Sequence, residues 1–173
     1  MKKIAVIIAN GTEELEALTP VDVLRRADVK VELISVLDKT ITGSHGIKIV
    51  ADKVVEEVEL TDYDCIVIPG GMPGATNISN NEKVISALKK ANENNKLIAS
   101  ICASPAVVLA QHNLLLDKKA TCYNTEVFVK ALAENYTGSD VEVCENLITA
   151  NGPKSAFKFS LSICEKLGLI PKF

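Results

Sequence analysis

The segment at residues 101–105, Ile-Cys-Ala-Ser-Pro, carries the most chemical information in this sequence. The apolar run before it, 97–101, predicts a buried strand, and residues 105–111 predict a helix. A cysteine at such a turn directs its sulfur toward the first free N–H groups of the helix, which favour the thiolate. Cys102 is therefore a candidate nucleophile or redox centre. The alternative is a small buried thiol that only fills the core.

Other polar groups should meet Cys102, because loops after parallel strands gather at one edge of a sheet. Residues 10–16 follow the first predicted strand and contain Glu13, Glu14 and Glu16. Acids in a first helical turn complement the helix dipole. A carboxyl group kept protonated by burial would also donate a hydrogen bond to the thiolate and shuttle a proton. Spacing alone does not choose among the three.

The glycine-rich loop 70–74 also belongs to this edge. It lacks the G-x-G-x-x-G and Walker spacings, so it does not predict a nucleotide site. It is a tight turn that needs positive φ angles, and the N–H groups of Gly71 and Ala103 could together hold an oxyanion. The two histidines, His45 and His112, are expected in a surface turn and at a solvated helix end. A Cys-His hydrolase would therefore need its base from elsewhere.

The elements that position these groups alternate along the chain. This alternation predicts a three-layer α/β/α sandwich with a mostly parallel central sheet, in one domain over residues 1–173. In the last helix, the inward-facing side chains are either Phe157, Leu161 and Cys164 or Phe159 and Ile163. Strands are expected at 3–9, 29–36, 64–69, 97–101, 119–122, 141–144 and 147–150, helices at 14–27, 81–94, 105–111 and 156–167, and a hairpin within 40–52.

Composition excludes several classes of function. The 173 residues carry a formal net charge of −3 and no block of Lys or Arg, which argues against nucleic acid as a partner. No apolar run approaches the ~20 residues of a membrane span. The first apolar run is too short for a secretory signal, so we expect a cytoplasmic protein. The five cysteines lack C-x-x-C spacing and predict neither a disulfide framework nor a metal site; Cys65 and Cys164 are expected in the core.

Five motifs resemble the ThiJ/PfpI superfamily, which is class I glutamine amidotransferase-like, and within it the branch of the Parkinsonism-associated protein deglycase. They occur in family order along the whole chain. The motifs are GTEELE at 11–16, PVDVLRR at 20–26, IPGG at 68–71, ICASP at 101–105 and NGP at 151–153.

The resemblance implies a flavodoxin-like fold, a homodimer and no cofactor. It places the family's reactive cysteine at Cys102 and its protonated partner carboxyl group at Glu16, with Gly71 and Ala103 as backbone donors. Glu14 and Arg26 match the family's acidic and basic pair near the dimer interface.

The chain also departs from the family pattern. A histidine near the cysteine in this branch is matched by Tyr123, and an arginine of the hairpin turn is matched by His45, so both are possible accessory residues. Lys154 replaces a glycine, and Ser104 replaces a glycine or alanine. The protease-like branch has a histidine directly after the cysteine, so Ala103 argues against peptidase activity.

The resemblance implies action on methylglyoxal-type α-oxoaldehydes or on their early glycation adducts, through a Cys102 thiolate and Glu16 as acid and base. The alternative is a redox-sensing or chaperone-like stress protein in which Cys102 is oxidised to sulfinic acid. An amidotransferase-like hydrolase is a third interpretation, which the missing catalytic histidine disfavours.

Overall fold

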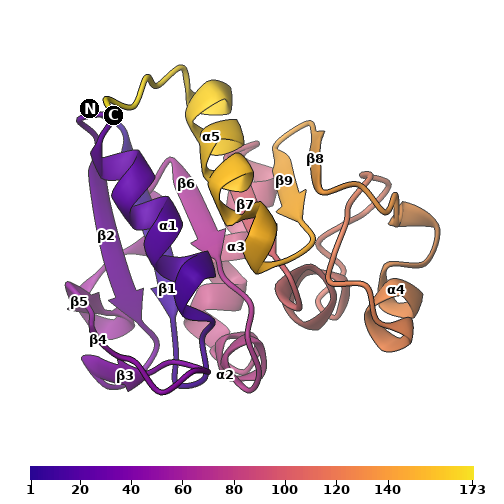
Figure 1. Ribbon diagram of the computed structural model, residues 1–173, viewed down its shortest axis with the longest axis horizontal. Helices are drawn as coiled ribbons and strands as arrows, with labels where there is room; N and C mark the ends of the chain where they lie inside the picture. Colours follow the sequence, from indigo (N-terminus) through magenta and orange to yellow (C-terminus); the bar gives the residue numbers. More distant parts are fainter.

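The computed structural model describes residues 1–173 and has a seven-stranded sheet at its centre (Figure 1). The strands, in spatial order, are β5 (Lys53–Val54), β2 (Lys30–Ser35), β1 (Lys3–Ile8), β6 (Cys65–Ile68), β7 (Leu97–Ile101), β9 (Leu147–Ala150) and β8 (Val141–Cys144). All neighbouring strands are parallel except β8 and β9, which form an antiparallel pair. The mostly parallel sheet of the sequence prediction is confirmed.

Helices cover both faces of this sheet. On one face α1 (Glu14–Arg25) packs beside α5 (Ala156–Leu167), and on the other lie α2 (Gly74–Ser79), α3 (Glu82–Glu93) and a π-helical segment, Pro105–Ala110 (Figure 1). Each face has its own apolar core. The central strands β1, β6 and β7 are buried along nearly their whole length, as both-sided burial of a parallel sheet requires. The three-layer α/β/α arrangement is therefore confirmed.

The expected hairpin is also present. Strands β3 (Thr40–Thr42) and β4 (Lys48–Val50) pair in antiparallel register, and the turn between them carries His45 and Gly46. Gly46 has a φ of 79°, which a glycine adopts at little cost. The hairpin lies beside the amino end of α1, and Gly11 N donates to Thr42 O at 2.9 Å.

One predicted strand was wrong. Residues 119–122 form no strand, and Ala120 makes only an isolated bridge with Tyr136. The reason is that β9 occupies the place beside β7. The backbone of this segment bonds to other groups instead, such as Thr121 N to Thr149 Oγ1 at 2.9 Å.

Three helical features also differ from the prediction. The segment after Cys102 is π-helical, and α2 and α4 (Glu126–Leu132) were not predicted because each is only one to two turns long.

The structure also decides which face of α5 is buried. Phe159, Ile163 and Cys164 are buried and Phe157 is half exposed, so the second inward-facing set, with Cys164 added, is the observed one. Cys65 and Cys164 lie in the core as expected. No helix is both long and apolar enough to cross a membrane.

Candidate active site

Cys102 lies directly after β7, at the carboxyl edge of the sheet. Its φ of 67° is in the left-handed region, which is uncommon for a residue with a side chain. Two backbone hydrogen bonds hold this conformation: Cys102 N donates to Ala150 O at 2.9 Å, and Tyr123 N donates to Cys102 O at 2.8 Å. The residue is 9% exposed. The turn thus holds Cys102 nearly buried at the end of the strand.

Glu16 is the carboxyl group that meets Cys102. It is fully buried in the first turn of α1, and its Oε2 accepts a hydrogen bond from Gly70 N at 2.7 Å. Its Oε1 is buried without a hydrogen-bond partner, and the carboxyl group contacts the Cys102 thiol. Burial raises the pKa of Glu16 to about 7, although the Cys102 thiol and the Gly70 N–H oppose the shift. This carboxyl group therefore keeps its proton well above the pH at which an exposed glutamate loses it.

The ionisation of Cys102 is coupled to that of Glu16. Burial raises the pKa of the Cys102 thiol, and the charge of an ionised Glu16 raises it further, while the N–H groups of Ala103 and Gly71 lower it. The turn position alone therefore does not produce a thiolate, contrary to the expectation from the helix end. When Glu16 holds its proton, its charge is absent and its O–H can donate to the sulfur. A thiolate at Cys102 thus depends on a neutral Glu16.

Glycines allow the two site loops to approach this closely. A Cβ on Gly70 would lie 2.7 Å from the Cys102 Cβ and 2.8 Å from Glu16 Oε2. A Cβ on Gly71, whose φ is 86°, would lie 2.4 Å from the backbone N of Glu13. The Ser104 hydroxyl donates to the Pro69 carbonyl and ties the cysteine turn to the glycine loop. The donors of Gly71 and Ala103 are thereby held beside one sulfur.

The three acids at the start of α1 have separate positions. Glu13 Oε2 accepts from Glu16 N at 2.9 Å and caps the helix. Glu14 points to the hairpin, where its Oε1 accepts from His45 N at 2.8 Å. Burial raises the pKa of Glu14, but hydrogen bonds from backbone N–H groups and from the His45 ring outweigh this effect and lower the pKa. Of the three, Glu16 is the one that reaches Cys102.

The remaining predicted residues are not all brought together. Tyr123 lies beside the site, about half exposed, with its ring against Gly152. His45 approaches Glu13 and Glu14. Arg26 follows the far end of α1, about 18 Å along the helix from Glu14, and pairs with Asp22 at 3.1 Å. Within one chain, Glu14 and Arg26 therefore do not form a pair.

His112 was expected to be solvated, but its Nε2 lies 2.9 Å from Ser79 Oγ. This contact joins α2 to the segment after the π-helical turn. The sequence carried no signal for it, because the two residues are far apart along the chain and neither lies in a motif.

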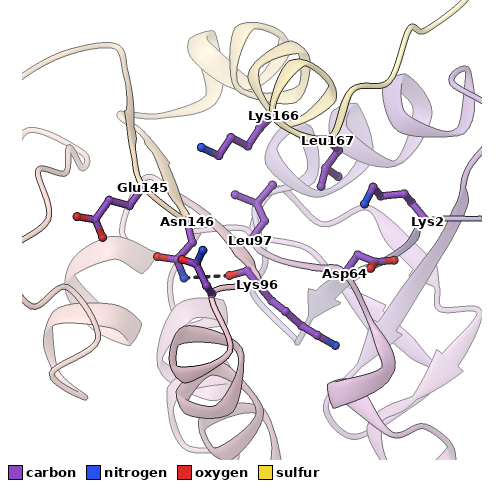
Figure 2. A pocket seen from close by; sticks show the side chains of 9 residues that line it. Lys2, Asp64, Lys96, Leu97, Glu145, Asn146, Lys166 and Leu167 are labelled. Carbon is purple, nitrogen blue, oxygen red and sulfur yellow. Dashed lines mark hydrogen bonds between the residues drawn. The ribbon is translucent and has the colours of Figure 1, made fainter.

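A cavity of about 640 Å³ lies at the opposite edge of the sheet. Figure 2 shows its charged rim, and the Asn146 amide there donates to Lys96 O at 3.0 Å. Leu97 is the first residue of β7 and Asp64 precedes β6, so this is the amino edge of the strands. Ligands of open parallel sheets bind beyond the carboxyl ends, where Cys102 lies. The cavity is thus separate from the candidate active site.

Known proteins resemble this chain over nearly its whole length. Protein DJ-1 homolog B of Arabidopsis thaliana is 41% identical over 165 residues, which is 95% of this chain and 37% of the relative. The chain spans 43% of DJ-1 homolog A from the same plant, so it covers less than half of either protein. The Parkinson disease protein 7 homolog of Danio rerio is 34% identical over 170 residues, 96% of this chain and 89% of the relative.

Solved structures show the same fold. Oxidized DJ-1 from Toxoplasma gondii has a TM-score of 0.92 at 40% identity, covering 96% of this chain and 91% of that one. Drosophila melanogaster DJ-1beta has a TM-score of 0.88 at 35% identity, covering 96% and 91%. The model of the DJ-1/PfpI family matches residues 2–166. The resemblance seen in the motifs is confirmed, and the chain belongs to the DJ-1/PfpI family.

Proposed function

We propose that this protein is a cofactor-independent cysteine enzyme that acts on methylglyoxal-type α-oxoaldehydes or on their early glycation adducts. The observation that carries the proposal is the contact of Cys102 with a buried carboxyl group, Glu16, whose pKa is raised to about 7. A group with a pKa near neutrality can both donate and accept a proton at physiological pH. Cys102 is only 9% exposed, which favours a substrate of a few carbon atoms.

The reaction begins with addition of the Cys102 thiolate to the aldehyde carbon. A C–S bond forms, the carbonyl π electrons move to oxygen, and the N–H groups of Gly71 and Ala103 stabilise this oxyanion. Glu16 donates its proton to the oxyanion, which gives a hemithioacetal and leaves Glu16 as a carboxylate. The site holds both donors beside the sulfur, where such an oxygen would develop.

Glu16 then moves a proton between the two carbons of the substrate. As a carboxylate it removes the proton from the former aldehyde carbon, which gives an enediolate, and it returns the proton to the adjacent carbon. The hydroxyl proton on the first carbon passes to the neighbouring oxygen. The product on the enzyme is a thioester of a 2-hydroxy acid. Water cleaves the thioester, so the net reaction is α-oxoaldehyde plus water to 2-hydroxy acid, and the thiol is regenerated. With an early glycation adduct, the free amine is released as well.

One further residue lies at the edge of this site. Tyr123, in the position of the family's histidine, has a hydroxyl that can donate a hydrogen bond but is a poor base at neutral pH. It lies beside the cysteine turn, and we assign the proton transfers to Glu16. All five cysteines are free thiols, which agrees with a proposed cytoplasmic location.

Conversion of methylglyoxal to lactate by the purified protein tests the proposal. We expect Cys102→Ala to abolish turnover and Glu16→Gln to reduce kcat about 100-fold or more, the usual contribution of a general acid-base. Cys144→Ala is the matched control, because Cys144 is a partly exposed thiol on β8, outside the site, and its loss should leave turnover unchanged. Equal rates in wild type, Cys102→Ala and Glu16→Gln would contradict the proposal.

A redox-sensing or chaperone-like role is the second candidate, and the same donors favour it. In that role the thiolate of Cys102 reacts with two equivalents of peroxide to give a sulfinate and two waters. The N–H groups of Gly71 and Ala103 and the Glu16 O–H would bind the sulfinate oxygens. Mass spectrometry after mild peroxide treatment separates the two roles: selective gain of two oxygens at Cys102 together with negligible lactate formation favours the sensor.

A further inference from the structure

A serine and a histidine that are far apart in sequence meet on the face of the sheet that carries α2 and α3. Ser79 is the last residue of α2, and its Oγ lies 2.9 Å from Nε2 of His112, 33 positions later in the chain. A hydroxyl within hydrogen-bond reach of an imidazole nitrogen is the arrangement that activates a serine as a nucleophile. This pair shares no residue with the Cys102 site.

The Ser79 hydroxyl bonds to the histidine ring rather than to its own helix. Serines within helices often donate to the carbonyl four residues earlier, as Ser160 Oγ does to Ala156 O at 2.7 Å in α5. Ser79 makes no such bond, and its hydrogen-bond partner is the His112 ring. With the ring proton on Nδ1, Nε2 accepts the hydroxyl hydrogen and can take it up as a base.

Both residues line one cavity of about 360 Å³. Ser79 is 5% exposed and His112 is partly exposed, so the pair is sheltered from bulk water but borders this space. The volume is at the small end of the range for ligand pockets, which suits a substrate with a short acyl chain. Ile85 is the one apolar residue of the lining, and Lys89 adds a positive charge to it.

The amino end of α3 borders the same cavity through Glu82, its first residue. The cap residue Asn81 accepts the N–H of Val84 at 3.0 Å, whereas the N–H groups of Glu82 and Lys83 have no hydrogen-bond partner. Free N–H groups and the positive end of a helix dipole stabilise an anion. An oxyanion formed by attack of Ser79 on an acyl carbon would therefore develop near a favourable helix end.

We propose that Ser79 and His112 form a second catalytic pair, which hydrolyses esters of short carboxylic acids. His112 Nε2 takes the hydroxyl proton while Ser79 Oγ bonds to the ester carbonyl carbon. The bond to the alkoxy group then breaks, and the alcohol leaves with the proton from His112. Water, activated by the same base, cleaves the acyl-serine to the carboxylic acid and restores the hydroxyl.

The pair lacks the third member of a triad. The carboxylate contacts of a histidine ring in this protein are those of His45, so no carboxylate orients the His112 ring. Loss of that orienting acid costs about 10⁴-fold in kcat in a serine protease. We therefore expect slow turnover, with an acyl-serine that lasts long enough to be detected.

Acetylation by p-nitrophenyl acetate tests the proposal in the Cys102→Ala protein, which lacks the thiol of the first site. Peptide mass spectrometry should find the acetyl group on Ser79. His112→Asn keeps a polar side chain but removes the base, and it should slow this acetylation about 100-fold or more. Ser86→Ala is the matched control, because Ser86 is an exposed serine that lines the same cavity without a histidine partner, and its loss should leave the rate unchanged.

A fluorophosphonate gives an independent readout on the wild-type protein, since it forms a stable ester with activated serines. It should label Ser79 in wild type and leave His112→Asn unlabelled, while circular dichroism shows both to be folded. Equal acetylation of Ser79 with and without His112→Asn, or no label on Ser79, would overturn the proposal. Neither readout measures lactate, so failure of the enzyme function proposed for Cys102 would leave this result unaffected.

Discussion

At the scale of single residues, Cys102 and Glu16 act as one ionising unit. Each lies in the interior; the charge of an ionised Glu16 raises the pKa of Cys102, whereas the hydrogen bond from the Cys102 thiol lowers the pKa of Glu16. The backbone donors of Gly71 and Ala103 favour the anion on sulfur, whereas burial of Glu16 favours its neutral form. A single proton on the carboxyl group therefore suits both a nucleophilic and a redox-active cysteine.

The raised pKa of Glu16 predicts a pH-dependent stability. In the unfolded chain Glu16 loses its proton near 4.5, but in the folded chain near 7. Between these values the unfolded state binds fewer protons, so the free energy of unfolding decreases as pH rises. From about pH 5 to about pH 7.5 this residue should cost about 2 kcal/mol of stability. Glu16→Gln should lack this decrease.

Urea unfolding of wild type and Glu16→Gln at the two pH values, in reductant and chelator, measures this difference. The variant keeps an oxygen for the Gly70 N–H and stays neutral throughout. Parallel pH dependence in the two proteins would show that Glu16 ionises normally.

At the scale of elements, α5 shows how packing resolves an ambiguous helical pattern. Its sequence offers two inward faces, and the structure buries Phe159, Ile163 and Cys164 while Phe157 stays half exposed. The choice follows from α1, which packs beside α5, and from β9 beneath it. The Phe159 ring then fills the core between this helix pair and the sheet.

Phe159→Ala should reduce the free energy of unfolding by about 3–5 kcal/mol, because it removes a fully buried aromatic ring and leaves a cavity. Lys158→Ala, one position earlier on the exposed side of α5, is the matched control and should change it by less than about 0.5 kcal/mol. Chemical denaturation followed by circular dichroism measures both. Similar values for the two variants would contradict the observed orientation of the helix.

At the scale of the whole molecule, the strand order gathers loops from three parts of the chain. The loops after β1, β6 and β7 end at one edge because these strands are parallel neighbours. The backbone hydrogen bond from Glu13 N to Gly70 O, at 3.0 Å, links the first two loops.

Exposed apolar side chains gather away from this edge. Leu18 of α1 and Phe157 of α5 line a groove between the two helices.

We propose that a second copy of the chain covers this groove, in keeping with the homodimer that the family resemblance implies. Light scattering after size-exclusion chromatography should give the mass of two copies for wild type and of one copy for Leu18→Glu. Leu37→Glu is the control, since Leu37 is exposed but does not line the groove. A wild-type mass of one copy, or the same mass for Leu18→Glu and wild type, would reject this interface.

Much of the architecture could be predicted from local sequence. The buried strand at 97–101 and the helix at 156–167 have the predicted bounds, because continuous apolar runs and helical spacing are local properties. The 119–122 prediction was wrong for a non-local reason: its apolar residues are buried, but the place beside β7 belongs to β9. A run of apolar residues therefore predicts that the segment is buried, but it does not predict which strand or helix packs against it.

The sequence by itself determined the alternation of the main strands and helices, the turn that carries Cys102 and the membership in the family. Spacing left open which of three neighbouring glutamates faces that cysteine, and the family resemblance indicated Glu16. The tertiary structure brings Glu16 to the cysteine and His45 to the other two glutamates. The physical reason is that a residue's charge state depends on burial and on the groups around it in space. Glu13, Glu14 and Glu16 are alike in sequence, yet a helix cap, a hairpin turn and an apolar interior give them three different environments.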